Sequence, residues 1–322
     1  MSQPAELSVV ILCEGHRDLL ARTLAALRGQ TARGRLELVF VCTSAAALGL
    51  TPGDVAGAAG HRLVELGDPL PVTSVGRAAG VRAAAAPVVA FAEDHSTPNP
   101  EWADALIARH RGEWAAVGPV MVNANPDRAM GWATFLTEYG EWAAPHPGGE
   151  WHHVPGHNGS YKRELLLPFG DALAGWLEAE SALQWHLAGR GHRFYVEPRA
   201  RTAHLNYERV WPAVRLRFDS GRLFAANRTR NWSTARRVGY AAGSPLIPVV
   251  RFARVARWAA RAAPPRMLPV VLPAAAALLA VSAAGEFVGY AVGAGRSHDR
   301  LAAEEYRRER FLAGPATPPP PA

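Results

Sequence analysis

Acidic and imidazole side chains follow one short apolar segment of this chain. Glu93, Asp94 and His95 come directly after Pro87–Ala92, which is short, apolar and β-branched, as buried strands are. Carboxylate and imidazole groups at a strand end can hold a divalent cation that neutralises charge on a leaving diphosphate. Acids at strand ends are also common as solvated turn residues or helix caps. The pattern alone therefore leaves both interpretations open.

Three further groups of polar residues are candidates for chemistry. Glu178 and Glu180 lie on a predicted helix, and one carboxylate there could be a general base, although a solvated helix face is the simpler explanation. The segment Pro155–Arg163 is small and polar, which suits a loop whose backbone approaches a ligand or one that only caps a helix. His204 stands alone after an apolar run, and a lone histidine is more often structural than a ligand.

Strand and helix patterns alternate along the first two hundred residues. The predicted strands are Leu7–Leu12, Leu36–Val41, Arg62–Leu66, Pro87–Ala92, Trp114–Val122 and His192–Val196. The predicted helices are His16–Gln30, Gly76–Ala86, Pro100–Arg109 and Leu177–Gly189, with weak helix or loop at Ala45–Gly60 and a mobile loop at Ala144–His153. This alternation indicates a mostly parallel sheet with helices on both faces. Ligands bind such sheets beyond the carboxyl ends of the strands, where Glu93 is expected.

Composition sets the size and the redox setting of the protein. The chain has 322 residues, of which 49% are apolar, enough for one α/β domain and an appendage. Cys13 and Cys42 lie in apolar runs, which indicates buried thiols in a reducing compartment. No secretory signal is expected, because Met1–Leu7 is polar and the apolar run that follows is too short.

The positive charge of the chain gathers in its C-terminal part. The net charge is +7, and residues 209–266 hold thirteen arginines against one acid, Asp219. A block of this kind needs an anionic partner, either lipid headgroups or nucleic acid. The apolar segment Met267–Gly295 beside it, whose one charged residue is Glu286, favours lipid over nucleic acid.

The length of that apolar segment is enough to span a bilayer. Arginines lie on both sides of it, so a hairpin that dips into one leaflet or a helix in the interface fits better than a single crossing. A buried helix of a soluble domain is the alternative. The tail Pro315–Ala322 is proline-rich and is expected to be disordered.

The order and spacing of these segments resemble GT-A glycosyltransferases of family 2 over roughly residues 7–206, and the C-terminal part resembles a membrane-associated bacterial branch. The matching segments are Ser8–Leu12 with a helix that ends at Gln30, Gly76–Val81 for the family's A-R-N-x-G-I segment, Phe91–Pro98 for its D-x-D block, Gly156–Arg163 for its acceptor loop, and Glu178–Phe194 for its E-D-x-x-L helix and G-Y-R segment. The resemblance implies a GT-A, Rossmann-like α/β fold.

The resemblance also implies roles for individual residues. Glu93 and His95 match the first and second acids of the D-x-D block, and His204 matches a histidine near the metal, so these would hold Mn²⁺ or Mg²⁺. Glu180 matches the aspartate of the E-D pair and would be the catalytic base, with Glu178 as the alternative. The donor nucleotide-sugar would be bound by Arg77, Thr43, Ser44, Glu93 and Asp94, and the acceptor by His157, Asn158, Gly159 and Ser160.

The implied reaction is a metal-dependent, inverting transfer of a sugar from a nucleotide-diphosphate-sugar to a lipid-linked or membrane-proximal glycan acceptor. The implied location is the cytoplasmic face of the inner membrane, on an anionic surface. The expected organisation is a GT-A domain (1–208), a basic amphipathic helical region (209–266), an apolar membrane-associated segment (267–295), and a basic helix with a proline-rich tail (296–322).

Two other functions fit parts of the sequence. A catalytically silent relative that binds or scaffolds is motivated by His95, by Ala179 in the E-D pair, and by Thr43 and Ser44 where the family has a nucleobase-reading aspartate. A nucleotidyltransferase is disfavoured, because its Gly-rich basic loop after the first strand is here Cys13–His16, with one glycine and one acid.

Overall fold

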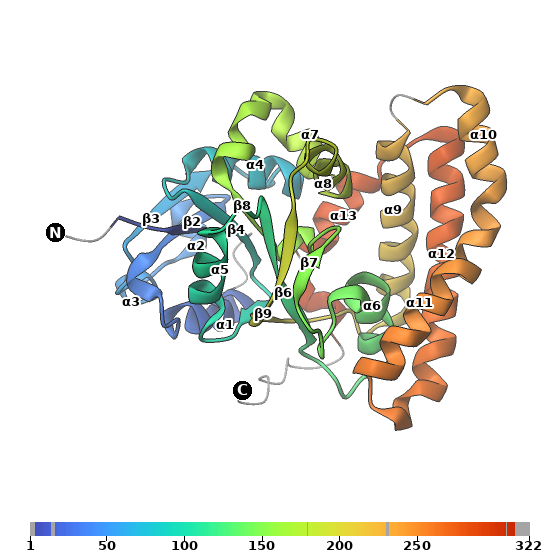
Figure 1. Cartoon of the computed structure of the whole chain (residues 1–322), viewed down its shortest axis with the longest axis horizontal. Helices are drawn as coiled ribbons and strands as arrows, with labels where there is room; N and C mark the ends of the chain where they lie inside the picture. Colours follow the sequence, from blue (N-terminus) through green and yellow to red (C-terminus); the bar gives the residue numbers. More distant parts are fainter. Residues whose placement is uncertain (1–3, 14–16, 179, 230–231, 307, 313–322) are drawn as a thin grey trace. The chain divides into compact units, whose positions relative to one another are not determined.

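The computed structural model describes residues 4–13, 17–178, 180–229, 232–306 and 308–312 (Figure 1). The chain forms two compact units, one within residues 1–122 and 146–204 and the other within residues 123–145 and 205–321. The domain boundary that the sequence places at residue 208 lies near the division at residue 204. Residues 123–145 belong to the second unit, although the sequence analysis includes them in the first domain.

The first unit is built on one sheet with the strand order β3-β2-β1-β4-β8-β6-β9-β5, and β7 also pairs with β9. Parallel pairs join β1 (Leu7–Cys13), β2 (Leu36–Cys42), β3 (Gly60–Glu65) and β4 (Val88–Glu93). Antiparallel pairs join β8 (Ser160–Lys162) to β4 and to β6 (Ala116–Asn123), and β9 (Phe194–His204) to β5 (Ser96–Pro98) and to β7 (Gly149–Trp151). The expected α/β class is confirmed. The strands that pair in parallel are the first four of the chain, β1 to β4.

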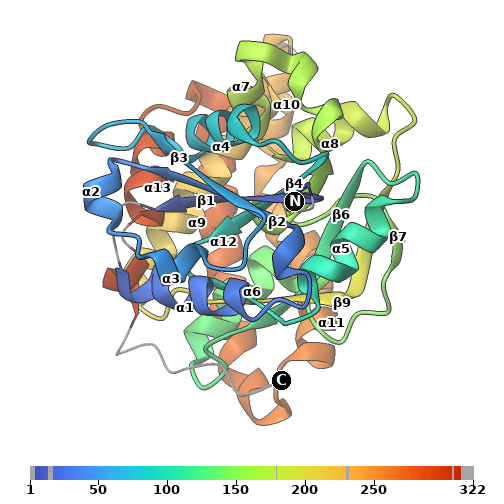
Figure 2. The ribbon, with the colours of Figure 1, turned by 90° about the vertical axis from the view of Figure 1, so that its left-hand side faces the viewer.

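Helices cover both faces of the sheet because alternate residues of its strands are apolar on both sides. Val9 and Ile11 of β1 pack in one cluster with residues of α1 and α5, and Val10 packs in a second cluster with residues of α4, α7 and α8. Figures 1 and 2 show α4 and α7 on one side of the sheet and α1 and α5 on the other. The helices of this unit are α1 (Arg17–Arg28), α2 (Ala45–Leu48), α3 (Pro52–Val55), α4 (Thr73–Ala83), α5 (Trp102–His110), α7 (Leu173–Leu177) and α8 (Glu180–Ala188).

Two glycines let α4 approach β1 closely. A Cβ atom on Gly80 would lie 2.3 Å from Val10 Cγ1, and one on Gly76 would lie 3.0 Å from Leu12 Cδ2. Residues four apart share one face of a helix, so both glycines turn the same bare face toward the strand. The Gly76–Val81 segment is therefore shaped by packing.

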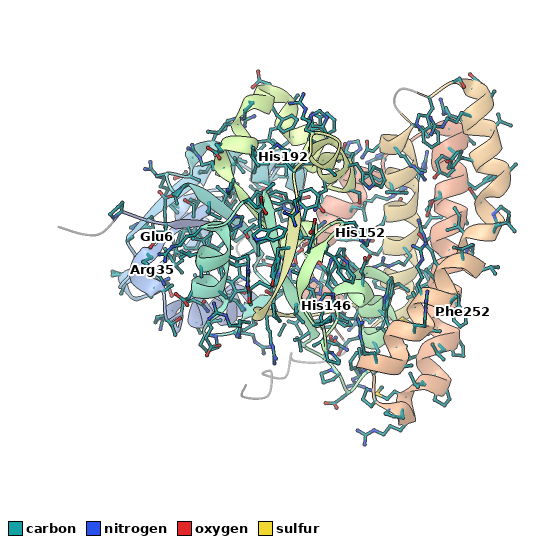
Figure 3. All side chains as sticks on the ribbon, in the orientation of Figure 1. Glu6, Arg35, His146, His152, His192 and Phe252 are labelled. Carbon is teal, nitrogen blue, oxygen red and sulfur yellow. The ribbon has the colours of Figure 1, made fainter. Side chains whose placement is uncertain are left out.

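The starts of the first two strands are joined by a pair of residues that Figure 3 labels. The backbone N–H of Glu6 donates to Arg35 O at 2.9 Å, and Arg35 Nη1 lies 3.4 Å from Glu6 Oε1. Further along these strands, Cys13 and Cys42 are register partners and remain buried free thiols, as expected. Burial, followed by the nearby Asp94 charge, raises the pKa of the Cys13 thiol well above its ordinary value, so it stays protonated and unreactive at neutral pH.

Three segments differ from the sequence predictions. The predicted loop Ala144–His153 contains β7, which pairs with β9. The predicted strand His192–Val196 continues through Pro198 to His204, although proline removes a backbone donor from a strand. The predicted helix Leu177–Gly189 corresponds to α8 (Glu180–Ala188), and its first residue, Leu177, is the last residue of α7.

The second unit is helical in the part of the chain that the structure describes. It contains α6 (Ala129–Tyr139), α9 (Val210–Arg228), α10 (Thr234–Gly243), α11 (Ile247–Ala262), α12 (Leu268–Val292) and α13 (Ser297–Glu305). α9 and α12 pack backbone to backbone, since a Cβ on Gly221 would lie 2.2 Å from Ser282 O and one on Gly285 would lie 2.1 Å from Phe218 O. Of the two forms expected for residues 267–295, a hairpin or a single interfacial helix, the hairpin is not formed, because residues 268–292 make one continuous helix.

Within the described residues, one helix is long and apolar enough to cross a membrane. It runs over Pro265–Val292. Its most apolar stretch of 18 residues has a mean hydropathy of 2.1, and 33% of that stretch is buried inside the protein. Length and composition of this kind also occur in the core helix of a soluble protein.

Candidate active site

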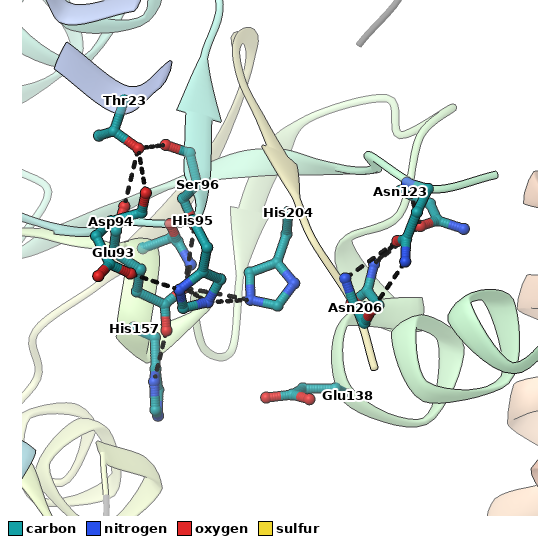
Figure 4. Close-up of polar contacts among 12 residues, drawn as sticks. Thr23, Glu93, Asp94, His95, Ser96, Asn123, Glu138, His157, His204 and Asn206 are labelled. Carbon is teal, nitrogen blue, oxygen red and sulfur yellow. Dashed lines mark hydrogen bonds and ion pairs between the residues drawn. The ribbon is translucent and has the colours of Figure 1, made fainter. Parts of the chain in front are cut away.

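Strand pairing brings two distant histidines together at one edge of the sheet. His95 precedes Ser96, the first residue of β5, and Ser96 is the register partner of His204, the last residue of β9. The two imidazole rings meet edge to face with their centroids 4.9 Å apart, and their Nε2 atoms are separated by 3.3 Å. Figure 4 shows both rings turned toward Glu93.

Glu93 completes a group of three potential metal ligands. It is the last residue of β4, and its Oε2 atom lies 3.3 Å from His204 Nε2 and 3.6 Å from His95 Nε2. An ion held at about 2.1 Å by each ligand would place neighbouring ligand atoms about 3.0 to 3.4 Å apart in octahedral or tetrahedral geometry. Two of the three separations, both 3.3 Å, fall in this range and the third is 3.6 Å, so the three residues could hold one divalent ion.

Asp94 fixes the orientation of the His95 ring. Its Oδ1 atom lies 2.9 Å from His95 Nδ1, and both side chains are buried. When Nδ1 donates to this carboxylate, the proton is on Nδ1 and the lone pair of Nε2 is left for a metal. Asp94, expected to contact the donor nucleotide, therefore lies beside His95 and acts on its ring.

Several groups hold Glu93 in its charged form. Burial by itself would raise the pKa of its carboxyl group, but the nearby His95 and hydrogen bonds from His157 and His204 hold that pKa well below its ordinary value. Asn158 Nδ2 also donates to Oε2 at 2.8 Å, and Ser96 Oγ donates to the same oxygen at 3.1 Å. The carboxylate is therefore ionised at neutral pH, as a metal ligand must be.

Thr23 of α1 holds the turn that carries the acids, and sequence reasoning missed it. Its buried Oγ1 lies 2.9 Å from the carbonyl oxygens of both Asp94 and Ser96 (Figure 4). The hydroxyl can donate to either oxygen, and this contact holds the turn against α1. Nothing in the sequence near Thr23 marks this role, because the contact spans more than seventy positions.

Arg77 and His157 form a second polar layer against Glu93. His157 Nδ1 lies 3.0 Å from Glu93 Oε1 and 2.8 Å from Arg77 Nη2. Only one of these contacts is a hydrogen bond at a time, because Nδ1 either donates to the carboxylate or accepts from the guanidinium. Arg77 is buried and its guanidinium also lies over the ring of Phe91, 5.8 Å from its centroid. His157, a candidate acceptor-binding residue, thus contacts both the candidate metal ligand Glu93 and Arg77, a candidate donor-binding residue.

Other predicted site residues have structural contacts. Ser160 is fully buried on β8, where its Oγ donates to Val117 O at 2.7 Å and lies 2.8 Å from His110 Nε2. Gly159 extends the sheet through its carbonyl, which accepts from Phe91 N at 3.0 Å. The Ser160 hydroxyl and the Gly159 carbonyl are thus engaged within the sheet, and their role toward an acceptor stays a prediction.

The two residues expected to read the nucleotide base follow β2. Ser44 caps α2, since its Oγ accepts from Ala47 N at 3.1 Å. The carbonyl of Thr43 accepts from Gly67 N at 3.2 Å, and both side chains are half-buried. Their role toward a nucleotide stays a prediction.

The two candidate bases lie where α7 meets α8. Glu178 follows the last residue of α7, and its backbone N–H donates to Ala174 O at 3.0 Å. Glu180 begins α8, and its side chain is outside the described residues. One turn further on, the buried Gln184 binds the backbone N–H and carbonyl of Val154, at 2.8 and 3.0 Å. This ties α8 to the loop that leads into His157 and Asn158.

Comparisons with known proteins add likenesses in fold. No protein-family model matches the chain, and no curated protein matches it. A structure of S. aureus TarS is 16% identical with a TM-score of 0.48, and the match covers 90% of this chain and 55% of that one. A crystal structure of GalNAc-T7 with UDP, GalNAc and Mn²⁺ is 15% identical with a TM-score of 0.46, covering 62% of this chain and 44% of that one. The chain thus spans about half the length of each, and its function has to be inferred from its own site.

Proposed function

We propose that this protein is a GT-A glycosyltransferase that uses a divalent cation and a nucleotide-diphosphate-sugar donor. The observation that carries the proposal is the buried triangle of Glu93 Oε2, His95 Nε2 and His204 Nε2, with sides of 3.3 to 3.6 Å. It lies beyond the carboxyl end of β4, where open α/β sheets bind their ligands. The order of motifs along the chain supports the same function.

The reaction we propose is a single displacement with inversion at the anomeric carbon. The acceptor hydroxyl loses its proton to a carboxylate while its oxygen attacks that carbon, and the bond between the carbon and the diphosphate oxygen breaks. A cation bound by Glu93, His95 and His204 would neutralise the negative charge on the departing diphosphate. Glu180 is the proposed base, with Glu178 as the alternative, because Glu180 matches the E-D pair of the resembled family.

The polar layer beside the triangle would position the two substrates. Arg77 carries a permanent positive charge within 2.8 Å of His157, which suits a diphosphate neighbour. His157 is partly exposed, whereas Asn158 is buried and donates to Glu93, so we assign acceptor contact to His157 and support of Glu93 to Asn158.

The acceptor and its location form a finer part of the proposal. The arginines of residues 209–266 and the apolar helix Pro265–Val292 would hold the protein at an anionic membrane surface. A lipid-linked or membrane-proximal glycan would then be the acceptor, at the cytoplasmic face of the inner membrane. Sedimentation of the protein with anionic but not with neutral vesicles would support this part.

A thermal-shift screen of nucleotide-sugars, with and without Mn²⁺, tests the proposal. We expect one nucleotide-sugar to raise the melting temperature of the full chain only when Mn²⁺ is present. Hydrolysis of that donor should then be lost in Glu93→Gln and kept in Glu164→Gln, which alters an exposed carboxylate. Stabilisation by Mn²⁺ and donor with equal, near-zero turnover in the wild type and both variants would instead identify a catalytically silent binding protein.

A further inference from the structure

A pocket of ≈ 430 Å³ opens in the helical unit between α10, α11 and α12. Arg228, the last residue of α9, also contributes to it. Its lining is formed by Arg228, Gly239, Tyr240, Gly243, Leu246, Ile247, Val250, Arg251, Arg254, Glu286 and Tyr290. All of these residues belong to the second unit, so the pocket is independent of the candidate active site.

The charge of this pocket is positive. Three arginines line it, Arg228, Arg251 and Arg254, against one acid, Glu286, which leaves 3 − 1 = 2 positive charges. The buried Glu286 carboxylate accepts from Arg251 Nη1 at 2.6 Å and so neutralises one arginine. Arg254 is exposed and makes no hydrogen bond or ion pair with the described residues. The net positive charge of its lining therefore suits the pocket to an anionic ligand.

Aromatic rings hold the Arg228 guanidinium in place. Its Cζ atom lies 5.0 Å from the centroid of Tyr240, 5.1 Å from that of Trp232 and 5.9 Å from that of Phe224. Cation–π contacts of this kind orient the guanidinium and reduce the entropy that it loses on binding an anion.

Exposed aliphatic side chains also belong to the pocket and its surroundings. Leu246 and Val250 line it and are 68% and 58% exposed, and Val249 beside them is 71% exposed. Figure 3 labels Phe252, which lies on α11 between the lining residues Arg251 and Arg254. Large exposed aliphatic side chains around a cationic pocket suit a ligand with a charged head and apolar chains, and a free inorganic anion would leave them in water.

We propose that this pocket binds the phosphate group of an anionic lipid, with the acyl chains against Leu246, Val249 and Val250. The pocket would then recognise a single lipid molecule, beyond the general attraction of a basic surface to a charged bilayer. This inference does not depend on the proposed transfer reaction, and its test measures binding without turnover.

Isothermal titration of the full chain with a short-chain phosphatidic acid, below its critical micelle concentration, tests the proposal. With a soluble monomeric lipid, the titration measures binding to the pocket and excludes the general attraction of the basic protein to a charged bilayer. Removal of one charge-assisted hydrogen bond weakens binding by about tenfold or more. We therefore expect Arg254→Gln to raise the Kd by at least that factor. Because Arg254 is exposed, the variant should fold normally, which its circular dichroism spectrum and melting temperature will show.

Arg257→Gln is the matched control. Arg257 lies on the same helix, is also exposed and loses the same charge, but it is outside the pocket lining. Its Kd should stay within about twofold of the wild type, because a small soluble ligand senses distant exposed charges weakly. Equal weakening by both variants would reveal a general charge effect and overturn the proposal.

Two further ligands separate a lipid from a free phosphate. Short-chain phosphatidylcholine, whose headgroup is neutral overall, should bind far more weakly than phosphatidic acid. Inorganic phosphate should also bind more weakly than phosphatidic acid. Leu246→Ser should weaken the binding of phosphatidic acid and leave the binding of inorganic phosphate unchanged. Inorganic phosphate that binds as tightly as the lipid would overturn the lipid assignment, and a chain that binds neither phosphatidic acid nor phosphate would overturn the site.

Discussion

His95 and His204 are 109 positions apart in the chain, yet their Nε2 atoms lie 3.3 Å from each other. The distance is set by backbone pairing, because Ser96 of β5 and His204 of β9 are register partners. His204 ends β9 and His95 lies in the turn directly before β5, so the pairing of these two strands holds the two imidazoles together.

Removal of one imidazole should abolish tight binding of Mn²⁺. We expect His204→Ala to raise the Kd for Mn²⁺ by more than about a hundredfold, since loss of a direct ligand exceeds the cost of altering its neighbours. Titration followed by electron paramagnetic resonance measures free and bound Mn²⁺. The exposed His61 provides the control, and His61→Ala should leave the Kd unchanged. Equal affinity in His204→Ala and the wild type would show that the triangle is not the metal site.

The carboxylate behind His95 should tune the same affinity. Asp94 Oδ1 lies 2.9 Å from His95 Nδ1, and loss of this negative charge makes the ring a weaker ligand. We expect Asp94→Asn to raise the Kd for Mn²⁺ by about tenfold to a hundredfold. The melting temperature without metal reports whether the fold is kept. A Kd that does not move would assign Asp94 another task, such as contact with the donor.

Much of the fold could be predicted from local pattern. Buried parallel strands read as short apolar runs, and β1, β2 and β4 lie within two residues of their predicted positions. The strands β5, β7 and β8 were not predicted. Each has three residues, which is too short for a hydrophobic period, and each is defined by its pairing with neighbouring strands. Helix α6 also lies in a region without a prediction.

The candidate site was predictable as a set of residue types and not as a set of contacts. Glu93, His95 and His204 were assigned as ligands through the family resemblance, and the structure places them together. Thr23 and the Arg77–His157 contact depend on distances between remote segments, for which one sequence holds no signal. The buried Ser160, assigned to the acceptor through the same resemblance, has partners within the sheet, and its contact with an acceptor stays a prediction.

The buried His110 should make stability depend on pH. Burial, followed by the charge of Lys162, lowers its pKa from 6.5 to about 3. In the unfolded chain His110 therefore binds a proton below about pH 6.5, whereas in the folded chain it binds one only below about pH 3. The free energy of unfolding is highest above pH 6.5 on this account and falls by up to ~1.4 kcal/mol per pH unit on acidification.

His110→Gln should remove this dependence. Urea unfolding at pH 7 and pH 5 should show that the wild type loses roughly 2 kcal/mol more than the variant over this interval. The variant can still donate to Ser160, and His61→Gln on the surface controls for loss of a histidine. Identical losses in wild type and His110→Gln would mean that His110 is protonated in the folded chain.

A side chain at Gly80 should destabilise the fold. A Cβ there would lie 2.3 Å from Val10 Cγ1, so Gly80→Ala has to shift α4 away from β1. We expect a loss of about 1 to 3 kcal/mol in the free energy of unfolding, measured in urea. Gly53→Ala in α3 is the control, because its Cβ would lie 3.7 Å from Thr51 Oγ1, an ordinary contact. A similar free energy for both variants would show that α4 can relax freely.

The choice between the two candidate bases can be made by matched substitutions. Glu178 and Glu180 are two positions apart where α7 meets α8, and α8 is anchored by Gln184 to the loop before His157. If Glu180 takes the acceptor proton, Glu180→Gln should lower kcat by about a hundredfold to ten-thousandfold and leave the Kd for the donor unchanged. Glu178→Gln should keep kcat within a few-fold of the wild type, measured with the donor that the thermal-shift screen identifies. The reverse pattern would transfer the role of base to Glu178, and full activity in both variants would place the base elsewhere.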